Sequence, residues 1–210
     1  MSIATTLLVR ASSALSLYGA GTPDRAARGF LSLENNRARE ERFVGLRVLG
    51  IDPGLARTGY AIVEEAGSRL YAPAIGVIKT LRGTAISERL CSLEEALLGI
   101  LGSFEPECVA LERVYFQVNA KSAIQVGEAA GVVLLVAGKF GLDVFGYSPN
   151  EVKRALTGYG AADKKQMASM TARLLGLEPA SIEADAADAA AVAVAHLNSS
   201  RLAASVRRAL

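Results

Sequence analysis

The chain is poor in the residues that cross-link small folds or bind soft metals. Among 210 residues it has two cysteines, one histidine and no tryptophan. Cys91 and Cys108 form no Cys-x-x-Cys pair and no cysteine–histidine set, which excludes a disulfide scaffold and a zinc-binding module. We expect both to be reduced thiols, buried in a protein of the cytoplasm. No apolar run approaches the roughly 18 residues of a membrane-spanning helix, so no transmembrane segment is predicted.

What is present is the composition of a folded domain, with 51% hydrophobic and 21% charged residues. These values exclude a mostly disordered or collagen-like chain. The net charge is +2, but residues 46–112 hold nine acidic against six basic residues, whereas residues 113–173 hold eight basic against four acidic. This distribution fits an acidic site beside a phosphate-binding surface, although ordinary surface variation is the better explanation when charge is taken alone.

Hydrophobic periodicity from residue 46 onward predicts a series of strands and helices. The expected strands cover residues 47–52, 60–65, 70–80, 107–112 and 143–147, and the expected helices cover residues 85–101, 120–140, 150–156, 164–175 and 182–198. Residues 53–59 are expected to form a turn, because their proline and glycines suit one. The order β-β-β-α-β-α-β-α-α-α indicates a mixed sheet flanked by helices, which is an α/β layer fold.

Two of the predicted strands end in a carboxylate. Asp52 and Glu112 each follow four apolar residues. A charge beside a buried strand is costly unless it is paired or binds a cation. The glycines that follow Asp52 leave room for a phosphate or a metal ion to approach the backbone closely. Taken alone, Asp52 before Pro53 is explained equally well as a turn cap.

A third acidic element opens the alanine-rich helix near the end of the chain. Asp185 and Asp188 are three residues apart, which places them on one face of the helix. Residues 189–195 are all small and apolar, which predicts close packing of this helix on the sheet. Two acidic residues in a first turn are also explained by the helix dipole alone.

Taken together, the four carboxylates can meet at one end of the sheet. Hard oxygen ligands of this kind suit Mg²⁺ or Mn²⁺. A pair of such ions activates water and stabilises the leaving oxygen in phosphodiester cleavage. The pattern therefore points to metal-assisted hydrolysis.

A series of motifs extends this pattern along the chain. They are Leu49–Gly54 with Thr58 and Gly59, Ala110–Glu112, Asn119–Ala120 with Ser122–Ala123, Gly127–Gly131, Val152–Lys153, Ala162–Lys164 with Gln166, and Ala184–Ala189. With these motifs in this order, residues 46–200 resemble the RuvC family of bacterial Holliday-junction resolvases, which belongs to the RNase H-like superfamily. A lone Asp-Pro-Gly would be a weak signal, but the ordered series is specific.

The resemblance implies an RNase H-like five-stranded mixed sheet and a Mg²⁺-dependent endonuclease. Such an enzyme resolves Holliday junctions in recombination and repair by paired symmetric nicks. The resemblance assigns metal binding and catalysis to Asp52, Glu112, Asp185 and Asp188. It implies two Mg²⁺ ions per subunit, with Mn²⁺ as a substitute. Some family members have histidine at the position of Asp185, so the role of that residue is the least fixed.

The resemblance also implies residues that bind DNA. Adjacent aromatic residues in a polar loop suit stacking on unpaired bases, and the resemblance places there an aromatic residue that helps to open the junction. Tyr115 aligns best with that position, whereas Phe116 is equally well explained as a core anchor. Lys153 and Lys164 are implied to contact the DNA backbone. We include Lys165, although solvation alone also explains it.

The implied assembly is a homodimer joined through the helix at 120–140, whose apolar residues cover most of its circumference. The implied partners are four-way junction DNA and the RuvA–RuvB branch-migration complex, with no membrane. His196 lies eight residues after Asp188. It either supports the metal site or is an ordinary buried histidine.

Residues 1–45 have no counterpart in this resemblance, and we treat them as an unassigned extension before a domain at residues 46–210. An upstream start codon, a disordered tail whose arginines add DNA affinity, and a targeting peptide are the three interpretations. Two other functions compete with the resolvase. One is an ATP-binding protein of the actin and sugar-kinase class, which needs two such lobes. The other is a non-catalytic nucleic-acid binder on the same fold, which has no need of four acidic residues.

Overall fold

The computed structural model describes the backbone of residues 45–113 and 120–209 and the side chains of residues 45–113 and 122–201. The strands are β1 (Arg47–Asp52), β2 (Arg57–Ala66), β3 (Arg69–Lys79), β4 (Cys108–Glu112) and β5 (Asp143–Tyr147). The helices are α3 (Ile86–Phe104), α4 (Ala120–Lys139), α5 (Pro149–Thr157), α6 (Lys164–Leu175), the short 3₁₀ helix η3 (Pro179–Ser181) and α7 (Ala184–Ala209). Residues 1–44 lie outside this description, so the extension and its boundary stay predictions.

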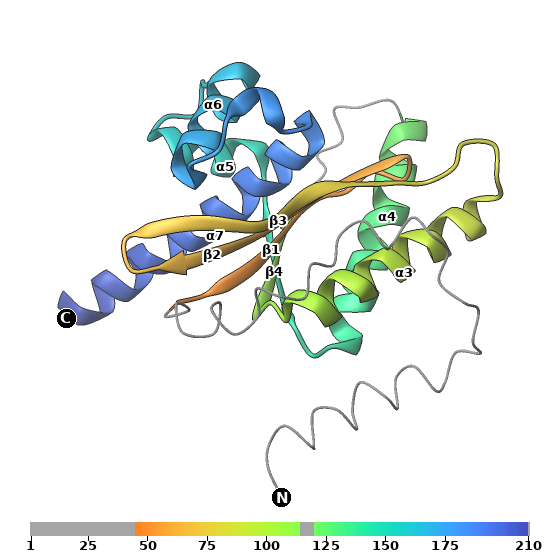
Figure 1. Ribbon diagram of the computed structural model, residues 1–210, viewed down its shortest axis with the longest axis horizontal. Coiled ribbons are helices and arrows are strands. Elements are labelled where there is room, and N and C mark those ends of the chain that lie inside the picture. The colour runs from red at the N-terminus through yellow and green to blue at the C-terminus, as the bar shows by residue number, and fades with distance from the viewer. Residues whose placement is uncertain (1–44, 114–119, 210) are drawn as a thin grey trace, which may run out of the picture. The chain divides into compact units, whose positions relative to one another are not determined.

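The five strands form one mixed sheet in the order β3-β2-β1-β4-β5, which confirms the predicted architecture (Figure 1). β1 pairs antiparallel with β2, and β2 pairs antiparallel with β3. β1 and β4, and then β4 and β5, are parallel. The carboxyl ends of these parallel strands therefore meet at one edge of the sheet, as the argument from Asp52 and Glu112 requires.

Strand β2 begins earlier than its sequence suggests. We expected residues 53–59 to form a turn, but Arg57 is already paired with Lys79 of β3, and Gly59 with Asp52 of β1. The proline and glycines favour a turn locally. Pairing on both sides outweighs that preference, because each neighbouring strand supplies hydrogen bonds that a turn would leave unmade. The correction places Arg57 on the sheet rather than in a loop.

The two faces of the sheet are covered by different helices (Figure 1). Side chains alternate along β1, so Val48 joins a core with α5, α6 and α7, whereas Leu49 and Ile51 join a core with α3 and α4. All three side chains are almost fully buried. Burial on both faces explains why the central strands read as nearly continuous apolar runs.

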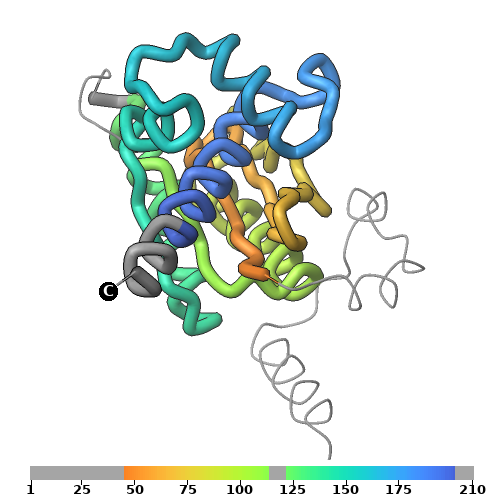
Figure 2. The backbone as a smooth tube through the Cα atoms, turned by 90° about the vertical axis from the view of Figure 1, so that its left-hand side faces the viewer, coloured from red at the N-terminus to blue at the C-terminus, as the bar shows by residue number. Residues whose placement is uncertain are grey.

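Helix α7 lies directly against the backbone of β1 and β2, and it crosses these strands in Figure 2. A Cβ atom added at Gly50 would collide with the carbonyl oxygen of Ala189 and would lie 2.8 Å from the Cβ of Ala193. A Cβ atom at Gly59 would collide with the carbonyl oxygen of Asp185. The predicted close packing is confirmed, and it holds the first turns of α7 at the end of the sheet where β1 ends.

The two cysteines differ in their surroundings. Cys108 is buried on β4, as expected, but Cys91 is exposed on α3. Its neighbours in the helix explain the difference, since Leu93 and Leu97 form the buried face of α3. Both thiols are free.

Helix α4 also departs from expectation. Its segment Ser122–Lys139 has a mean hydropathy of 1.3 over 18 residues, which is long and apolar enough to cross a membrane. By length and composition one helix therefore passes a test that the sequence analysis expected no segment to pass, although the core helix of a soluble protein passes the same test. Ala129, Val133 and Val136 are buried in the core beneath the sheet, whereas Leu134 and Leu135 are 50% and 55% exposed. One face of α4 thus serves the core, and apolar side chains remain on the other.

The packing of α7 predicts that Gly50→Ala destabilises the protein. The new methyl group must displace the backbone of α7, and overpacking of this kind costs about 1–3 kcal/mol. Chemical denaturation would measure the loss. Gly99→Ala is the matched control, because a Cβ atom at Gly99 meets nothing within 4 Å and alanine is the better helix former. Equal stability of the two variants would contradict the direct contact of α7 with β1.

Candidate active site

The backbone brings the four predicted carboxylates to one edge of the sheet. Asp52 ends β1 and Glu112 ends β4, and these parallel strands are in register at Ile51 and Leu111, one residue earlier. The two acidic side chains are therefore neighbours. Asp52 is also paired with Gly59, against which the carbonyl oxygen of Asp185 lies.

Asp52 and Glu112 share a proton. Burial, followed by the charge and hydrogen bond of Glu112 and the charges of Asp188 and Asp185, raises the pKa of Asp52 to about 8. Burial also raises the pKa of Glu112, whereas the hydrogen bond from Asp52 and the charge of Lys164 lower it. The proton therefore stays on Asp52 at neutral pH, and Glu112 accepts its hydrogen bond. Removal from water is thus the main reason that Asp52 favours its protonated form, and the neighbouring negative charges add to it.

Lys164 neutralises Asp188 from the start of α6. Its Nζ lies 2.8 Å from Oδ2 of Asp188, and this bond raises the pKa of the ammonium group. Asp163 caps the helix by accepting from the backbone N–H of Gln166 at 2.8 Å, and Gln166 accepts in return from the N–H of Asp163 at 3.1 Å. The capping box holds the helix start in place, which positions the lysine. The Lys164 side chain is 69% exposed and faces both the carboxylates and solvent.

Arg57 neutralises Asp185, as Lys164 neutralises Asp188. The sequence analysis did not identify Arg57 as a residue of the site. Its Nε donates to Oδ2 of Asp185 at 2.5 Å, and its Nη2 donates to Oε2 of Glu183 at 2.7 Å. Lys79 adds a second cation, with Nζ 3.0 Å from Oε2 of Glu183. The pairing of β2 with β3 brings Arg57 and Lys79 together. The missed signal was a basic residue just before the strand predicted at residues 60–65 and another near the end of the strand predicted at residues 70–80, which antiparallel pairing brings together.

The carboxylates suit a hard divalent ion in their chemistry. Within residues 45–113 and 120–209, no group of three or more histidine, cysteine, aspartate or glutamate side chains is arranged to hold a metal ion as it stands. Asp185 and Asp188 instead bind Arg57 and Lys164. The donor set nevertheless fits Mg²⁺ or Mn²⁺, because all four groups supply oxygen and two of them retain a proton between them. Asp52, Glu112, Asp185 and Asp188 are the residues that would hold such ions.

His196 is a structural histidine rather than a neighbour of the carboxylates. Its Nδ1 lies 2.8 Å from the hydroxyl of Tyr147, and its Nε2 lies 3.4 Å from Sγ of Cys108. The Phe145 ring lies 4.5 Å from the imidazole ring, centroid to centroid. Burial lowers the pKa of His196, so it is neutral at pH 7. These contacts join α7 to β4 and β5.

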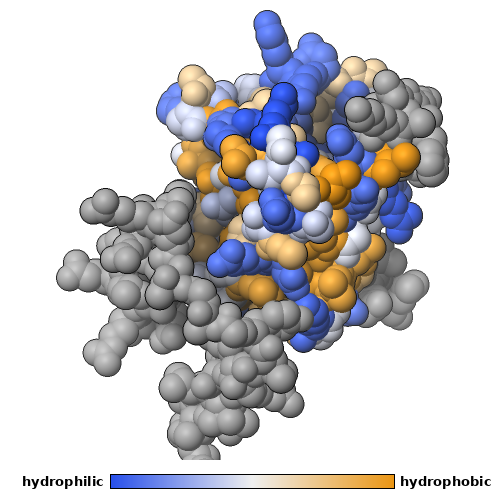
Figure 3. Space-filling view, turned by 90° about the vertical axis from the view of Figure 1, so that its right-hand side faces the viewer, coloured by the Kyte–Doolittle hydropathy of each residue, from blue (hydrophilic) through white to orange (hydrophobic). Residues whose placement is uncertain are grey.

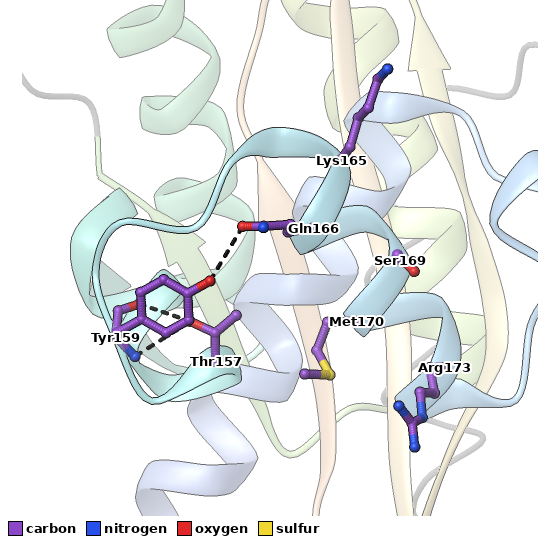
Figure 4. Close-up of a pocket in the computed structure, with 7 residues that line it drawn as sticks. All are labelled: Thr157, Tyr159, Lys165, Gln166, Ser169, Met170 and Arg173. Atoms are coloured by element: carbon purple, nitrogen blue, oxygen red, sulfur yellow. Dashed lines mark hydrogen bonds between the residues drawn. The ribbon is translucent and has the colours of Figure 1, made fainter.

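Two further predicted DNA contacts lie on α5 and α6. Lys153 is half-buried on α5. Lys165 lines a hollow of about 470 Å³ between α5 and α6, together with Tyr159, Met170 and Arg173 (Figure 4). The hollow does not include any of the four carboxylates. Tyr115 and Phe116 fall outside the described residues, so their stacking roles stay predictions.

Comparison with known proteins shows the family that this chain resembles. A family model described as crossover junction endodeoxyribonuclease RuvC matches residues 48–196. A relative of that description from Corynebacterium efficiens is 43% identical over 153 residues, which are 72% of this chain and 69% of the relative. One from Caldicellulosiruptor saccharolyticus is 44% identical over 156 residues, with 74% and 94% covered.

A solved structure agrees with these sequence matches. Thermus thermophilus RuvC in complex with Holliday junction substrate aligns with a TM-score of 0.72 and 35% identity, over 75% of this chain and 96% of that one. This likeness confirms the RNase H-like sheet that the resemblance implied. The four carboxylates, Arg57 and Lys164 all lie within the residues that the family model matches.

The protonation of Asp52 predicts that Asp52→Asn stabilises the metal-free protein at alkaline pH. The folded pKa is about 8, against an ordinary value of 3.8. Between these values the folded state holds a proton that the unfolded state has released. The free energy of unfolding of the wild type therefore falls as the pH rises through this window, and the asparagine variant avoids that loss.

Denaturation with EDTA at about pH 5 and about pH 9 would test this, with the advantage of the variant expected to grow by about 2–4 kcal/mol between them. Taking the difference between variant and wild type cancels the titration of groups that do not interact with Asp52. An advantage that does not change with pH would show that Asp52 ionises normally.

Proposed function

The chain belongs to the RuvC family of crossover junction endodeoxyribonucleases, and we propose on this basis that it cuts four-way DNA junctions at its carboxylate cluster. The observation that carries the proposal is the convergence of carboxylates from β1, β4 and α7 at one end of the sheet, where burial and then the neighbouring carboxylates raise the pKa of Asp52. Acidic groups from three separate elements repel one another, so gathering them destabilises the fold unless a cation binds there. The expected reaction is hydrolysis of one phosphodiester bond in each of two strands, at symmetric positions.

Asp52, Glu112, Asp185 and Asp188 would hold Mg²⁺, two ions per subunit, with Mn²⁺ as a substitute. Such ions, when bound, supply an activated water molecule and stabilise the leaving oxygen of the phosphodiester. Asp52 gives up its proton to become a ligand. The contact of α7 with Gly59 keeps the helix carboxylates in reach of the strand carboxylates.

Basic residues beside the cluster would bind the DNA backbone. Lys164 has the best placement, because its exposed ammonium group already lies at the carboxylates. Lys153 and Lys165 lie on α5 and α6 and would extend the contact along the DNA. Each phosphate neutralised in this way makes binding more sensitive to salt. Tyr115 and Phe116 would stack on bases at the junction centre.

Neither competing function is favoured by the findings. The relatives and the solved structure described above are crossover junction endodeoxyribonucleases. A non-catalytic binder would have no use for the pair that shares a proton, because uncompensated carboxylates repel DNA phosphates. We therefore retain the resolvase, acting in recombination and repair in the cytoplasm, with the RuvA–RuvB complex as a proposed partner.

We also propose that α4 joins two copies of the chain. Ile124, Leu134 and Leu135 are 50–63% exposed, and Phe140 follows the helix at 44%. Figure 3 looks onto the side of α3 and α4 and shows apolar surface among the polar side chains. A second copy would cover these side chains and bring two carboxylate clusters into one particle. Two clusters are what paired nicks require.

The function is tested by Asp52→Asn with a synthetic four-way junction. The variant should bind the junction within about threefold of wild type, yet cut it at least about 100-fold more slowly with Mg²⁺. Asparagine keeps the shape and removes the charge. Gel shift without metal and strand cleavage with metal would measure the two effects, with linear duplex as the control substrate. Loss of binding together with cleavage would make Asp52 structural, and unchanged cleavage would remove it from the site.

The dimer is tested by Leu135→Glu. A buried carboxylate at the interface is costly, so the variant should be a monomer by light scattering while the wild type is a dimer. Leu81→Glu is the control, because Leu81 is 73% exposed and lies outside α4. A monomeric wild type would overturn the interface, and sedimentation of wild type with lipid vesicles would assign the apolar face to a membrane instead.

A further inference from the structure

Arg57 binds two carboxylates at once, whereas Lys164 binds one. Arg57 binds Asp185 through Nε at 2.5 Å and Glu183 through Nη2 at 2.7 Å. Glu183 in turn binds Lys79 at 3.0 Å. The four side chains form a chain of alternating charge along the edge of the carboxylate cluster. Their side chains are 30–55% exposed, so solvent and ions reach them.

The fold leaves Arg57 little freedom to move away. The residue lies on a strand paired on one side with β3 at Lys79. Two residues further along β2, Gly59 touches the backbone of Asp185. The arginine and its acceptor are therefore attached to backbones in direct contact. Both of its hydrogen bonds raise the pKa of Arg57, so it keeps its charge.

Lys164 has a different character. It binds Asp188 alone through one flexible side chain that is 69% exposed. A lysine held by a single exposed ion pair exchanges partners readily. Arg57 offers a planar fork that two carboxylates occupy together. Lys164 can therefore turn to a DNA phosphate, whereas Arg57 stays with Asp185 and Glu183.

We propose that Arg57 is a positioning residue for Asp185 and a resident cation that weakens the binding of divalent metal by the carboxylate cluster. This inference rests on the proposed metal site. The guanidinium group occupies Oδ2 of Asp185, which leaves Oδ1 as the free oxygen of that carboxylate. Glu183 anchors the guanidinium group so that it holds Asp185 in one orientation. The cluster thus binds metal less tightly and presents a better ordered carboxylate.

Removing the Arg57 side chain is expected to raise the affinity for metal and to lower the cleavage rate. A fixed positive charge beside a cation site repels the incoming ion, so removing it strengthens metal binding. Losing the hydrogen bonds lets Asp185 rotate, and a misplaced ligand slows the chemical step. A residue that only stabilised the fold would not raise metal affinity and lower the cleavage rate together.

The test is titration of Mn²⁺ into the full chain by calorimetry, without DNA. Arg57→Gln should bind Mn²⁺ about threefold to tenfold more tightly than wild type. Arg57→Lys keeps the charge and should stay within about twofold. Arg69→Gln is the matched control, because it also removes one positive charge but lies at the opposite end of the β2–β3 pair, opposite Ala66. At saturating Mn²⁺, Arg57→Gln should nick junctions more slowly than wild type.

The possible outcomes distinguish a failure of this inference from a failure of the proposed function. An Arg57→Gln variant that binds Mn²⁺ no more tightly than Arg69→Gln would overturn the inference while leaving the metal site intact. A wild type that binds no Mn²⁺, or an Asp52→Asn variant that binds it as well as wild type, would overturn the proposed function instead. A smaller salt dependence of junction binding in Arg57→Gln, with unchanged Mn²⁺ affinity, would make Arg57 a DNA contact. Circular dichroism of each variant identifies any that fail to fold, and Arg57→Lys then still tests the positioning role, because lysine keeps the charge but lacks the planar fork and should slow the nicking of junctions.

Discussion

Helix α7 can carry its carboxylates to the sheet only because Gly50 and Gly59 present no side chains to it. The alanine-rich face of the helix rests on the backbone of β1 and β2. Gly59 is the partner of Asp52 in the sheet and the contact of Asp185 in the helix. The spacing between strand and helix carboxylates is therefore set by backbone packing, which is far stiffer than any side-chain torsion. Replacing either glycine would change the site together with the core.

This stiffness has an electrostatic cost. Four acidic groups gather at one place, and burial together with neighbouring carboxylates raises the pKa of Asp52 and of Glu112. Lys164 and Arg57 offset part of the remaining charge from opposite sides. Functional sites often retain such destabilising charge because their ligands need it. On our proposals the two cations have different roles. Lys164 can leave Asp188 to bind a DNA phosphate, whereas Arg57 stays bound to Asp185.

The errors made from the sequence share one cause, which is that local patterns do not report which neighbours a segment will have. Residues 53–59 contain turn formers, yet pairing with β3 makes Arg57 part of a strand, and Gly59 pairs with β1 as well. Cys91 is an apolar residue type, yet the face of α3 on which it lies looks outward. In α4, the apolar composition was visible, but the exposed fraction of Leu134 and Leu135 depends on where the sheet ends.

The sequence by itself determined the order of strands and helices, the α/β class and the identity of the four carboxylates. These follow from periodicity, from acidic residues at the ends of apolar strands and from ordered motifs, all of which are local. Only the tertiary structure decided which cation faces which carboxylate, where the proton between Asp52 and Glu112 resides, and that His196 belongs to the core. Those properties depend on distances between segments far apart in the chain, and pairing and packing of the folded backbone set these distances.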